Sequence, residues 1–377
     1  MSAAPREDAV PFDAGTLANP ATAALRAYDP GHDLPALRRR FGAAIAELGS
    51  NENPLGPSPR ALEAMRAALA DSWRYPDPRG AALKTALAQR LDVGDDRIAL
   101  GNGSHELLML LAQCFADPAH SIVFSQYGFA VFPIATAAAG AQPVRVPALP
   151  RGHASAPFGH DLDALAAAVR GDTRIVYLAN PNNPTGTWFE DEALARFLAR
   201  VPRDVLVVVD EAYHEYVDAP GLGSALRFAD RHPNLVVTRT FSKAYALAGL
   251  RVGYLVAHAS VVAVLERLRE SFNVNHVALA GAEAALADRD HLASVRAFNG
   301  DERAWLREAL AARGYAVLPS QTNFLLVDLA RDASGFERHL FERGVIVRPM
   351  DGYGLGRTVR ISIGSRAENQ RLLDALP

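Results

Sequence analysis

The apolar run Val205-Leu-Val-Val-Val209 constrains the fold of this chain most strongly, because it is short and contains no polar side chain. Such a run is typical of a strand that is buried on both faces of a sheet. Helix-like segments separate it from other predicted strands at 97–100, 122–124, 174–179 and 235–238. This alternation predicts an α/β fold with a mostly parallel sheet covered by helices.

Chemically active side chains follow these predicted strands directly. In an open parallel sheet, ligands bind just outside the carboxyl ends of the strands. The sequence therefore predicts that a single site brings together Ser104, Tyr127, Asn183, Asp210, Tyr213 and Lys243.

The pattern changes towards both ends of the chain. Residues 1–60 are expected to form an N-terminal arm and part of a small domain, and residues 61–260 a large, ligand-binding domain. From 261 onwards, two long helical segments at 261–286 and 292–313 precede short strands mixed with helices. We expect residues 261–377 to form a smaller α+β domain.

Composition excludes several classes of function. The net charge of −3 offers no basic field for nucleic acid. The one cysteine, Cys114, cannot form an intrachain disulfide, which indicates a reducing compartment. No uncharged apolar run reaches the roughly 20 residues of a membrane span, and the first ten residues lack the apolar core of a secretion signal. We expect a cytoplasmic enzyme without nucleic-acid or membrane partners.

The segment from Thr238 to Tyr254 contains a lysine, Lys243, among small residues and hydroxyls. Desolvation lowers the pKa of such a lysine towards that of a nucleophilic amine. Thr240, Ser242 and an arginine eight positions after the lysine, Arg251, could hold a phosphate. This combination suggests pyridoxal phosphate, bound as a Schiff base and anchored by its phosphate. The alternative is a surface lysine that follows a strand.

The glycine turn Gly101-Asn-Gly-Ser104 precedes a predicted helix, and a helix N-terminus favours an anion. The turn is not a dinucleotide fingerprint, because Glu106 stands at its last glycine position and no acid ends the next strand. A nicotinamide oxidoreductase is therefore disfavoured. Asp210 and His214 have metal-like spacing, but they follow a strand, so we expect no metal site.

Pyridoxal phosphate also needs a carboxylate that keeps its pyridine nitrogen protonated. Asp210 fits this need, since a buried carboxylate beside a pyridinium is a paired charge. The segments Asn183-Pro-Thr-Gly186, Asp210-Glu-Ala-Tyr213, Ser242-Lys243 and Arg251-Val-Gly253 resemble those of fold-type-I aminotransferases.

Within that family, the chain resembles histidinol-phosphate aminotransferases over essentially its whole length. Six further segments carry this resemblance: 50–58, 74–77, 101–104, 344–348, 359–364 and 368–369. It implies a fold-type-I structure and a reaction in which L-histidinol phosphate and 2-oxoglutarate interconvert with imidazole acetol phosphate and L-glutamate.

The resemblance also implies roles around the cofactor ring. Lys243 would bind the cofactor aldehyde and, once released, move the proton between Cα and C4′. Asp210 would pair with the ring nitrogen. Asn183 and Tyr213 would hold the 3-oxygen, and Tyr127 would stack on the ring.

For the cofactor phosphate, the resemblance implies a set of donors around the helix N-terminus. These are Ser104, the amide of His105, Thr240, Ser242 and Arg251. His105 stands where the family usually has an acidic residue or asparagine, which matters little for a backbone donor. Tyr75 would reach the phosphate of a neighbouring subunit, which implies a homodimer with shared sites.

For the substrate, Arg360 and Arg348 would bind the anionic end, because a guanidinium fork matches either a carboxylate or a phosphate. Tyr28 and Asn53 would help to close the site. The arm Leu25-Arg-Ala-Tyr28 lacks a proline that is common before this tyrosine.

Other activities remain open at this stage. One alternative is a related transaminase that acts on aromatic amino acids. Another is a phospho-amino-acid decarboxylase, because that activity occurs in proteins of similar sequence. A cofactor-binding regulator without catalysis would need a DNA-binding domain, and the aminotransferase-like motifs begin near residue 50.

Overall fold

A computed structural model of the chain describes residues 13–25, 33–42 and 45–377. Its central sheet has seven strands in the order β2-β8-β7-β6-β5-β3-β4. Their bounds are β2 Ile98–Gly101, β3 Ser121–Ser125, β4 Gln142–Val146, β5 Thr173–Ala179, β6 Leu206–Asp210, β7 Leu235–Thr240 and β8 Gly253–Val256.

Strands β3 to β7 are parallel to their neighbours, which confirms the predicted mostly parallel sheet. Strand β8 is the exception, since it runs antiparallel to both β2 and β7. Neither β8 nor the edge strand β4 was predicted from the sequence. The chain reverses after β7 through a short 3₁₀ helix, η6 (Ala248–Leu250), and through Arg251, whose φ of 56° is left-handed.

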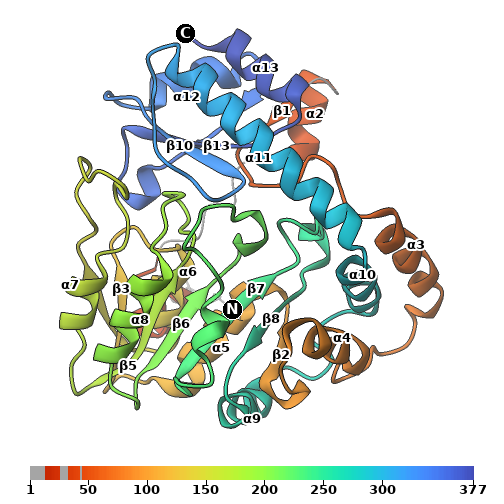
Figure 1. Ribbon diagram of the computed structural model, residues 1–377, viewed down its shortest axis with the longest axis vertical. Helices are drawn as coiled ribbons and strands as arrows, with labels where there is room; N and C mark the ends of the chain where they lie inside the picture. The colour runs from red at the N-terminus through yellow and green to blue at the C-terminus, as the bar shows by residue number, and fades with distance from the viewer. Residues whose placement is uncertain (1–12, 26–32, 43–44) are drawn as a thin grey trace, which may run out of the picture.

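Helices cover both faces of this sheet (Figure 1). Their bounds are α3 Pro59–Ala68, α4 Ala81–Leu91, α5 Gly103–Phe115, α6 Val131–Ala138, α7 Leu162–Ala167, α8 Asp191–Arg200, α9 Ala259–Leu268 and α10 His276–Ala287. Successive residues of β6 point to opposite faces. Val208 packs with Leu108 of α5, whereas Val207 and Val209 pack with Phe197 of α8. Burial on both faces explains the apolar run.

The helical segment predicted at 261–286 is wrong as one helix, because it divides into α9 and α10. Arg269 leaves the helical region with ψ 133°, and Phe272 adopts a left-handed φ of 61°. Asn275 then caps α10 by accepting a hydrogen bond from Ala278 N at 2.8 Å. Local capping therefore overrides an apolar pattern that continues through the break.

A second, four-stranded antiparallel sheet has the order β12-β13-β10-β9, and β1 pairs with β11 in parallel. The bounds are β1 Ala46–Glu47, β9 Ala316–Val317, β10 Phe324–Asp328, β11 Val345–Ile346, β12 Arg348–Pro349 and β13 Thr358–Ser362, with helices α11 Arg289–Ala311, α12 Ser334–Phe341 and α13 Arg366–Ala375. Figure 1 shows α11 running from beside α10 to this small sheet. The β1–β11 pairing ties the segment after residue 45 to the C-terminal part of the chain.

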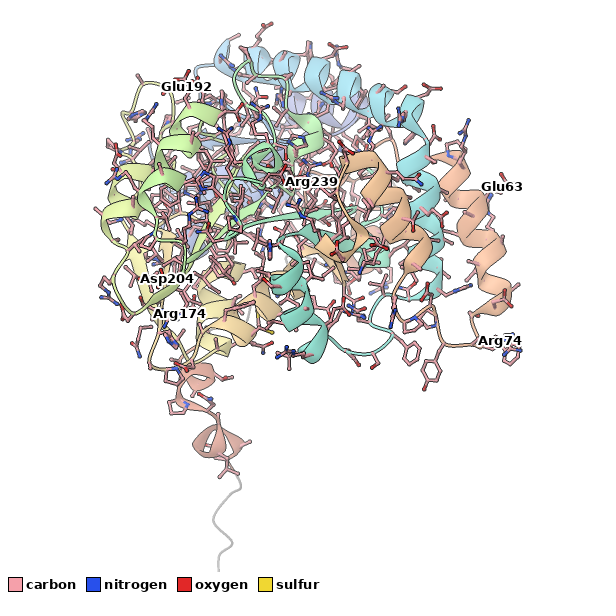
Figure 2. The ribbon with its side chains drawn as sticks, turned by 60° about the horizontal axis from the view of Figure 1, so that its bottom comes forward. Glu63, Arg74, Arg174, Glu192, Asp204 and Arg239 are labelled. Atoms are coloured by element: carbon pink, nitrogen blue, oxygen red, sulfur yellow. The ribbon has the colours of Figure 1, made fainter. Side chains whose placement is uncertain are left out.

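The N-terminal segments form η1 Ala14–Leu17, α1 Pro20–Ala23 and α2 Leu34–Phe41. Figure 2 shows α1 projecting from the body of the molecule. The remaining 3₁₀ helices are η2 Leu69–Asp71, η3 Asp95–Arg97, η4 His214–Tyr216, η5 Ala225–Phe228 and η7 Asp351–Tyr353. Within the three described ranges, no helix has the length and apolar character needed to cross a membrane.

Candidate active site

A cavity of about 200 Å³ lies where β5, β6 and β7 end, lined by Ala179, Asp210 and Thr240 from the last positions of these strands. Ten of the residues predicted from the sequence line it. They are Ser104, His105, Asn183, Asp210, Tyr213, Thr240, Ser242, Lys243, Arg251 and Arg360. The parallel sheet therefore brings together residues that lie up to 256 positions apart, from 104 to 360.

Asp210 is the last residue of β6 and is 3% exposed. Its Oδ1 accepts a hydrogen bond from Thr238 Oγ1 at 2.8 Å. Burial raises the pKa of Asp210 to about 7, while the hydrogen bond from Thr238 acts in the opposite direction. A positive group in the cavity would therefore stabilise the ionised form of this carboxylate.

Lys243 lies on the loop that follows β7, and its Nζ donates to the carbonyl oxygen of Asn51 at 3.3 Å. Burial, and then the guanidinium of Arg360, lower the pKa of Lys243 to about 8. The amine is thus partly neutral near physiological pH, which a nucleophile or a general base requires.

Asn51 is a component of the site that the sequence analysis did not identify. It is 1% exposed and has a left-handed φ of 56°. Its Nδ2 donates to the Tyr213 hydroxyl at 2.9 Å, and its own N–H donates to Ser362 Oγ at 2.8 Å. The residue predicted from the same segment is Asn53. Asn53 instead donates to the carbonyl oxygen of Ala244 at 2.9 Å and is not among the residues that line the cavity.

One end of the cavity combines a helix N-terminus with hydroxyls and a guanidinium. Arg251 Nη1 donates to Ser242 Oγ at 3.2 Å, and Thr240 Oγ1 donates to the same hydroxyl at 2.9 Å. Ser104 is in the first turn of α5, where unpaired N–H groups and the helix dipole favour an anion. Gly103 has a φ of +77°, and a Cβ there would lie 2.6 Å from Arg251 Nη2. Only glycine at residue 103 allows the Arg251 guanidinium to occupy this position.

His105 follows Ser104 in the first turn of α5. Burial and the nearby Arg251 guanidinium lower the pKa of this imidazole. His105 is therefore neutral at physiological pH and adds no second positive charge beside Arg251. Its predicted contribution, a backbone amide, stays a prediction.

The opposite side of the cavity is formed by Arg360 of β13. Its Nη1 donates to Asn183 Oδ1 at 2.6 Å and its Nη2 to the carbonyl oxygen of Gly49 at 2.8 Å. Its Nε is buried and has no hydrogen-bond partner among the residues that the structure describes. Tyr213 packs edge-to-face against Phe324, and burial raises the pKa of its phenol well above the ordinary value. The phenol is a proton donor at neutral pH.

Four other predicted residues lie outside this cavity or outside the described residues. Tyr127 contacts Phe158 edge-to-face, whereas Phe129 of the same loop lines the cavity. Arg348 lines a different cavity, of about 550 Å³. Tyr75 is 81% exposed, and Tyr28 lies outside the described residues.

The residues fit pyridoxal phosphate in type and in placement. The cradle at Gly103, Ser242 and Arg251 has the donors that a phosphate needs, and a single Cβ at residue 103 would obstruct it. Asp210 and Lys243 line the same cavity.

His214, whose spacing from Asp210 resembles that of metal ligands, is not directed at this site. Its Nδ1 lies 3.8 Å from Glu211 Oε2. Within the part of the chain that the structure describes, no cluster of three or more His, Cys, Asp or Glu could hold a metal.

Comparison with known proteins agrees with this geometry. The family model for aminotransferase class I and II matches residues 44–376, so the chain belongs to this family. Histidinol-phosphate aminotransferase 2 of Pseudomonas aeruginosa is 51% identical to it, over 96% of both chains. Histidinol-phosphate aminotransferase 1 of Nitrosococcus oceani is 48% identical, over 93% of this chain and 94% of its own.

Among solved structures, the histidinol-phosphate aminotransferase of Sinorhizobium meliloti in complex with pyridoxal-5'-phosphate is similar, with a TM-score of 0.83. It is 35% identical to this chain and covers 95% of it and 96% of its own length. The predicted fold-type-I architecture and the aminotransferase class are thereby confirmed.

Proposed function

We propose that this chain is a pyridoxal-phosphate-dependent aminotransferase that interconverts L-histidinol phosphate and 2-oxoglutarate with imidazole acetol phosphate and L-glutamate. One observation carries the proposal: Lys243, Asp210 and Arg360 line one cavity that ends in a phosphate cradle. The names of the similar proteins from Pseudomonas aeruginosa and Nitrosococcus oceani support this substrate.

The residues of this chain would divide the work as follows. Bound pyridoxal phosphate supplies an electron sink for the bond that breaks at the substrate Cα. Asp210 would hold a proton on the ring nitrogen by charge pairing. Lys243 would take the proton from the substrate Cα and deliver it to C4′ of the cofactor, because its pKa of about 8 leaves the amine partly neutral. Ser104, Ser242 and Arg251 would hold the phosphate.

Arg360 is proposed to bind the anionic group of each substrate. It is 8% exposed, and within the described ranges its Nε has no hydrogen-bond partner. The guanidinium donates to two neutral oxygens, Asn183 Oδ1 and the Gly49 carbonyl oxygen. These two acceptors do not neutralise its positive charge. Arg348 lies directly opposite Arg360 in the β12–β13 pair, which places both side chains on one face. We propose that the two arginines together accept either a carboxylate or a phosphate.

We propose that the active unit is a homodimer in which Tyr75 contacts the cofactor phosphate of the partner subunit. Tyr75 is 81% exposed and stacks on Phe272 with ring centroids 4.7 Å apart. Arg74, next to it, lies at the periphery of the molecule (Figure 2). An exposed, preoriented tyrosine is suited to act outside its own chain.

The dimer proposal is tested by light scattering together with Tyr75→Phe. The active species should be a dimer, and the variant should retain pyridoxal phosphate about ten- to a hundredfold less tightly, as expected for one hydrogen bond to a charged group. Full activity of a monomer would reject the dimer.

We also propose that the protein is cytoplasmic, which agrees with one cysteine in 377 residues. We propose in addition that the domain boundaries lie near residues 60 and 260.

A separate experiment tests whether the protein binds pyridoxal phosphate through Lys243. The purified protein should absorb near the border of the visible and ultraviolet ranges, and borohydride should fix the cofactor on Lys243. Lys243→Ala should abolish the fixation. A colourless protein that pyridoxal phosphate does not reconstitute, or a label on another lysine, would reject the proposal.

The substrate is tested by a panel with 2-oxoglutarate as the acceptor: histidinol phosphate, histidinol, phenylalanine, tyrosine and threonine phosphate. Histidinol phosphate should have the highest kcat/KM, and histidinol should be poor because buried guanidinium donors would lose their charged partner. A higher kcat/KM for phenylalanine would replace the assignment with an aromatic aminotransferase. Release of CO₂ without formation of glutamate would replace it with a decarboxylase.

A further inference from the structure

The side chain of Asp210 has one hydrogen-bond donor within the described part of the chain, the hydroxyl of Thr238 at 2.8 Å from Oδ1. Thr238 is completely buried, and Asp210 is 3% exposed. Asp210 lines the cavity but Thr238 does not. The hydroxyl therefore contacts the carboxylate from behind, and this leaves the cavity side of the carboxylate free for a ligand.

The sheet itself sets this contact. Asp210 and Thr238 are partners in the parallel register between β6 and β7, so that their side chains lie next to each other on one face of the sheet. Arg239 follows Thr238 and points to the other face, where it pairs with Glu211. A β-branched residue has few χ1 rotamers, which restricts the directions that the hydroxyl can take.

We propose that Thr238 is a positioning residue that holds one oxygen of Asp210 so that the other oxygen faces the cofactor ring nitrogen. This inference rests on the proposed function. An O–H donor also favours the ionised carboxylate. Burial alone drives Asp210 towards the neutral acid, and Thr238 opposes this effect. Without the hydroxyl, the carboxyl group would stay protonated to a higher pH and could turn away from the ring.

The test uses Thr238→Val, which keeps the shape of the side chain and removes the donor, and Thr238→Ser, which keeps the donor. Pyridoxal phosphate is titrated into the cofactor-free proteins by fluorescence. The valine variant should bind about tenfold more weakly, as expected from the loss of a hydrogen bond to a charged group. The pH below which binding weakens should rise by about one unit. Thr238→Ser should keep most of the wild-type affinity and most of the wild-type pH dependence.

A double-mutant cycle separates positioning from a general loss of structure. In an Asp210→Ala background, Thr238→Val should cause no further loss of affinity, because no carboxylate remains to be held. Thr136→Val is the matched control. It removes another buried hydroxyl, which donates to the carbonyl oxygen of Phe132 at 2.8 Å outside the cavity, and it should leave affinity unchanged.

Two results would overturn the inference. One is wild-type affinity and pH dependence in Thr238→Val. The other is an equal loss of affinity in the Asp210→Ala background, which would assign the effect to packing. Failure of the unmodified protein to bind pyridoxal phosphate would instead reject the proposed function, so the two failures are distinguishable.

Discussion

Arg360 Nη1 lies 2.6 Å from the side-chain oxygen of Asn183, and this hydrogen bond joins the small sheet to the loop after β5 across the cavity. Arg360 belongs to β13, whereas Asn183 is four residues beyond the end of β5. An oxyanion that enters the cavity would compete with the neutral amide oxygen for the guanidinium. Binding of an anion is thus coupled to a contact between the two sheets.

Arg360→Lys should lower kcat/KM for both histidinol phosphate and glutamate by about ten- to a hundredfold. Lysine keeps the positive charge but loses the planar fork that binds an oxyanion with two donors. Steady-state kinetics with both donors check this expectation. Arg357→Lys, at an exposed position on the same segment, is the control and should leave both values unchanged. A loss for one donor only would mean that the two anions bind at different residues.

Gly103→Ala should weaken the binding of pyridoxal phosphate but not of pyridoxal, which lacks the phosphate. The added Cβ would lie 2.6 Å from Arg251 Nη2 at a backbone φ of +77°, so that the guanidinium must move. Equilibrium titration of the cofactor-free protein with both compounds measures the difference. Gly152→Ala is the control, since among the described residues nothing beyond its own chain neighbours lies within 4 Å of its added Cβ. Equal losses for the two compounds would contradict a phosphate-specific effect.

Arg239→Met should lower the free energy of unfolding by about 3–5 kcal/mol, because it leaves the buried carboxylate of Glu211 without its partner. Arg239, labelled near the middle of the view in Figure 2, is 7% exposed, and its Nη2 is 2.8 Å from Glu211 Oε2. Urea unfolding measures the change. Replacing Glu211 with Gln in the same protein should recover part of the loss. Arg196→Met breaks an exposed pair with Glu192 at 3.9 Å and should cost less than about 1 kcal/mol.

The stability of the cofactor-free protein should depend on pH through Asp210. Its pKa is about 7 in the folded protein, and an unfolded aspartate has a pKa of about 3.9. Between these values the folded state holds a proton that the unfolded state has released. Stability therefore falls as the pH rises from about 4 to 7, by up to about 1.4 kcal/mol per pH unit from this group.

The measurement compares urea unfolding of the wild type with that of Asp210→Asn across this range. Asparagine keeps an oxygen that can accept the Thr238 hydrogen bond, but it does not titrate. The variant should gain stability relative to the wild type as the pH rises. A difference that does not vary with pH would show that Asp210 is already ionised in the empty site.

The sequence by itself determined five of the seven strands of the central sheet, β2, β3, β5, β6 and β7, and the site residues that follow them. The run 205–209 had to be a buried strand because it offers no polar face, and Asp210 therefore had to stand at its end. The same local reasoning located Lys243 after β7 and Ser104 at the start of α5. These inferences succeeded because apolar patterning and helix starts depend on a few adjacent residues.

Only the tertiary structure decided which side chains complete the cavity. Asn51 and Asn53 share one turn-rich segment, and nothing local separates them. Asn51 enters the site because Ser362, 311 residues later, holds its backbone. Thr238 contacts Asp210 because the β6–β7 register pairs them. Contacts between distant segments depend on strand register and packing, and local patterns in the sequence do not specify either.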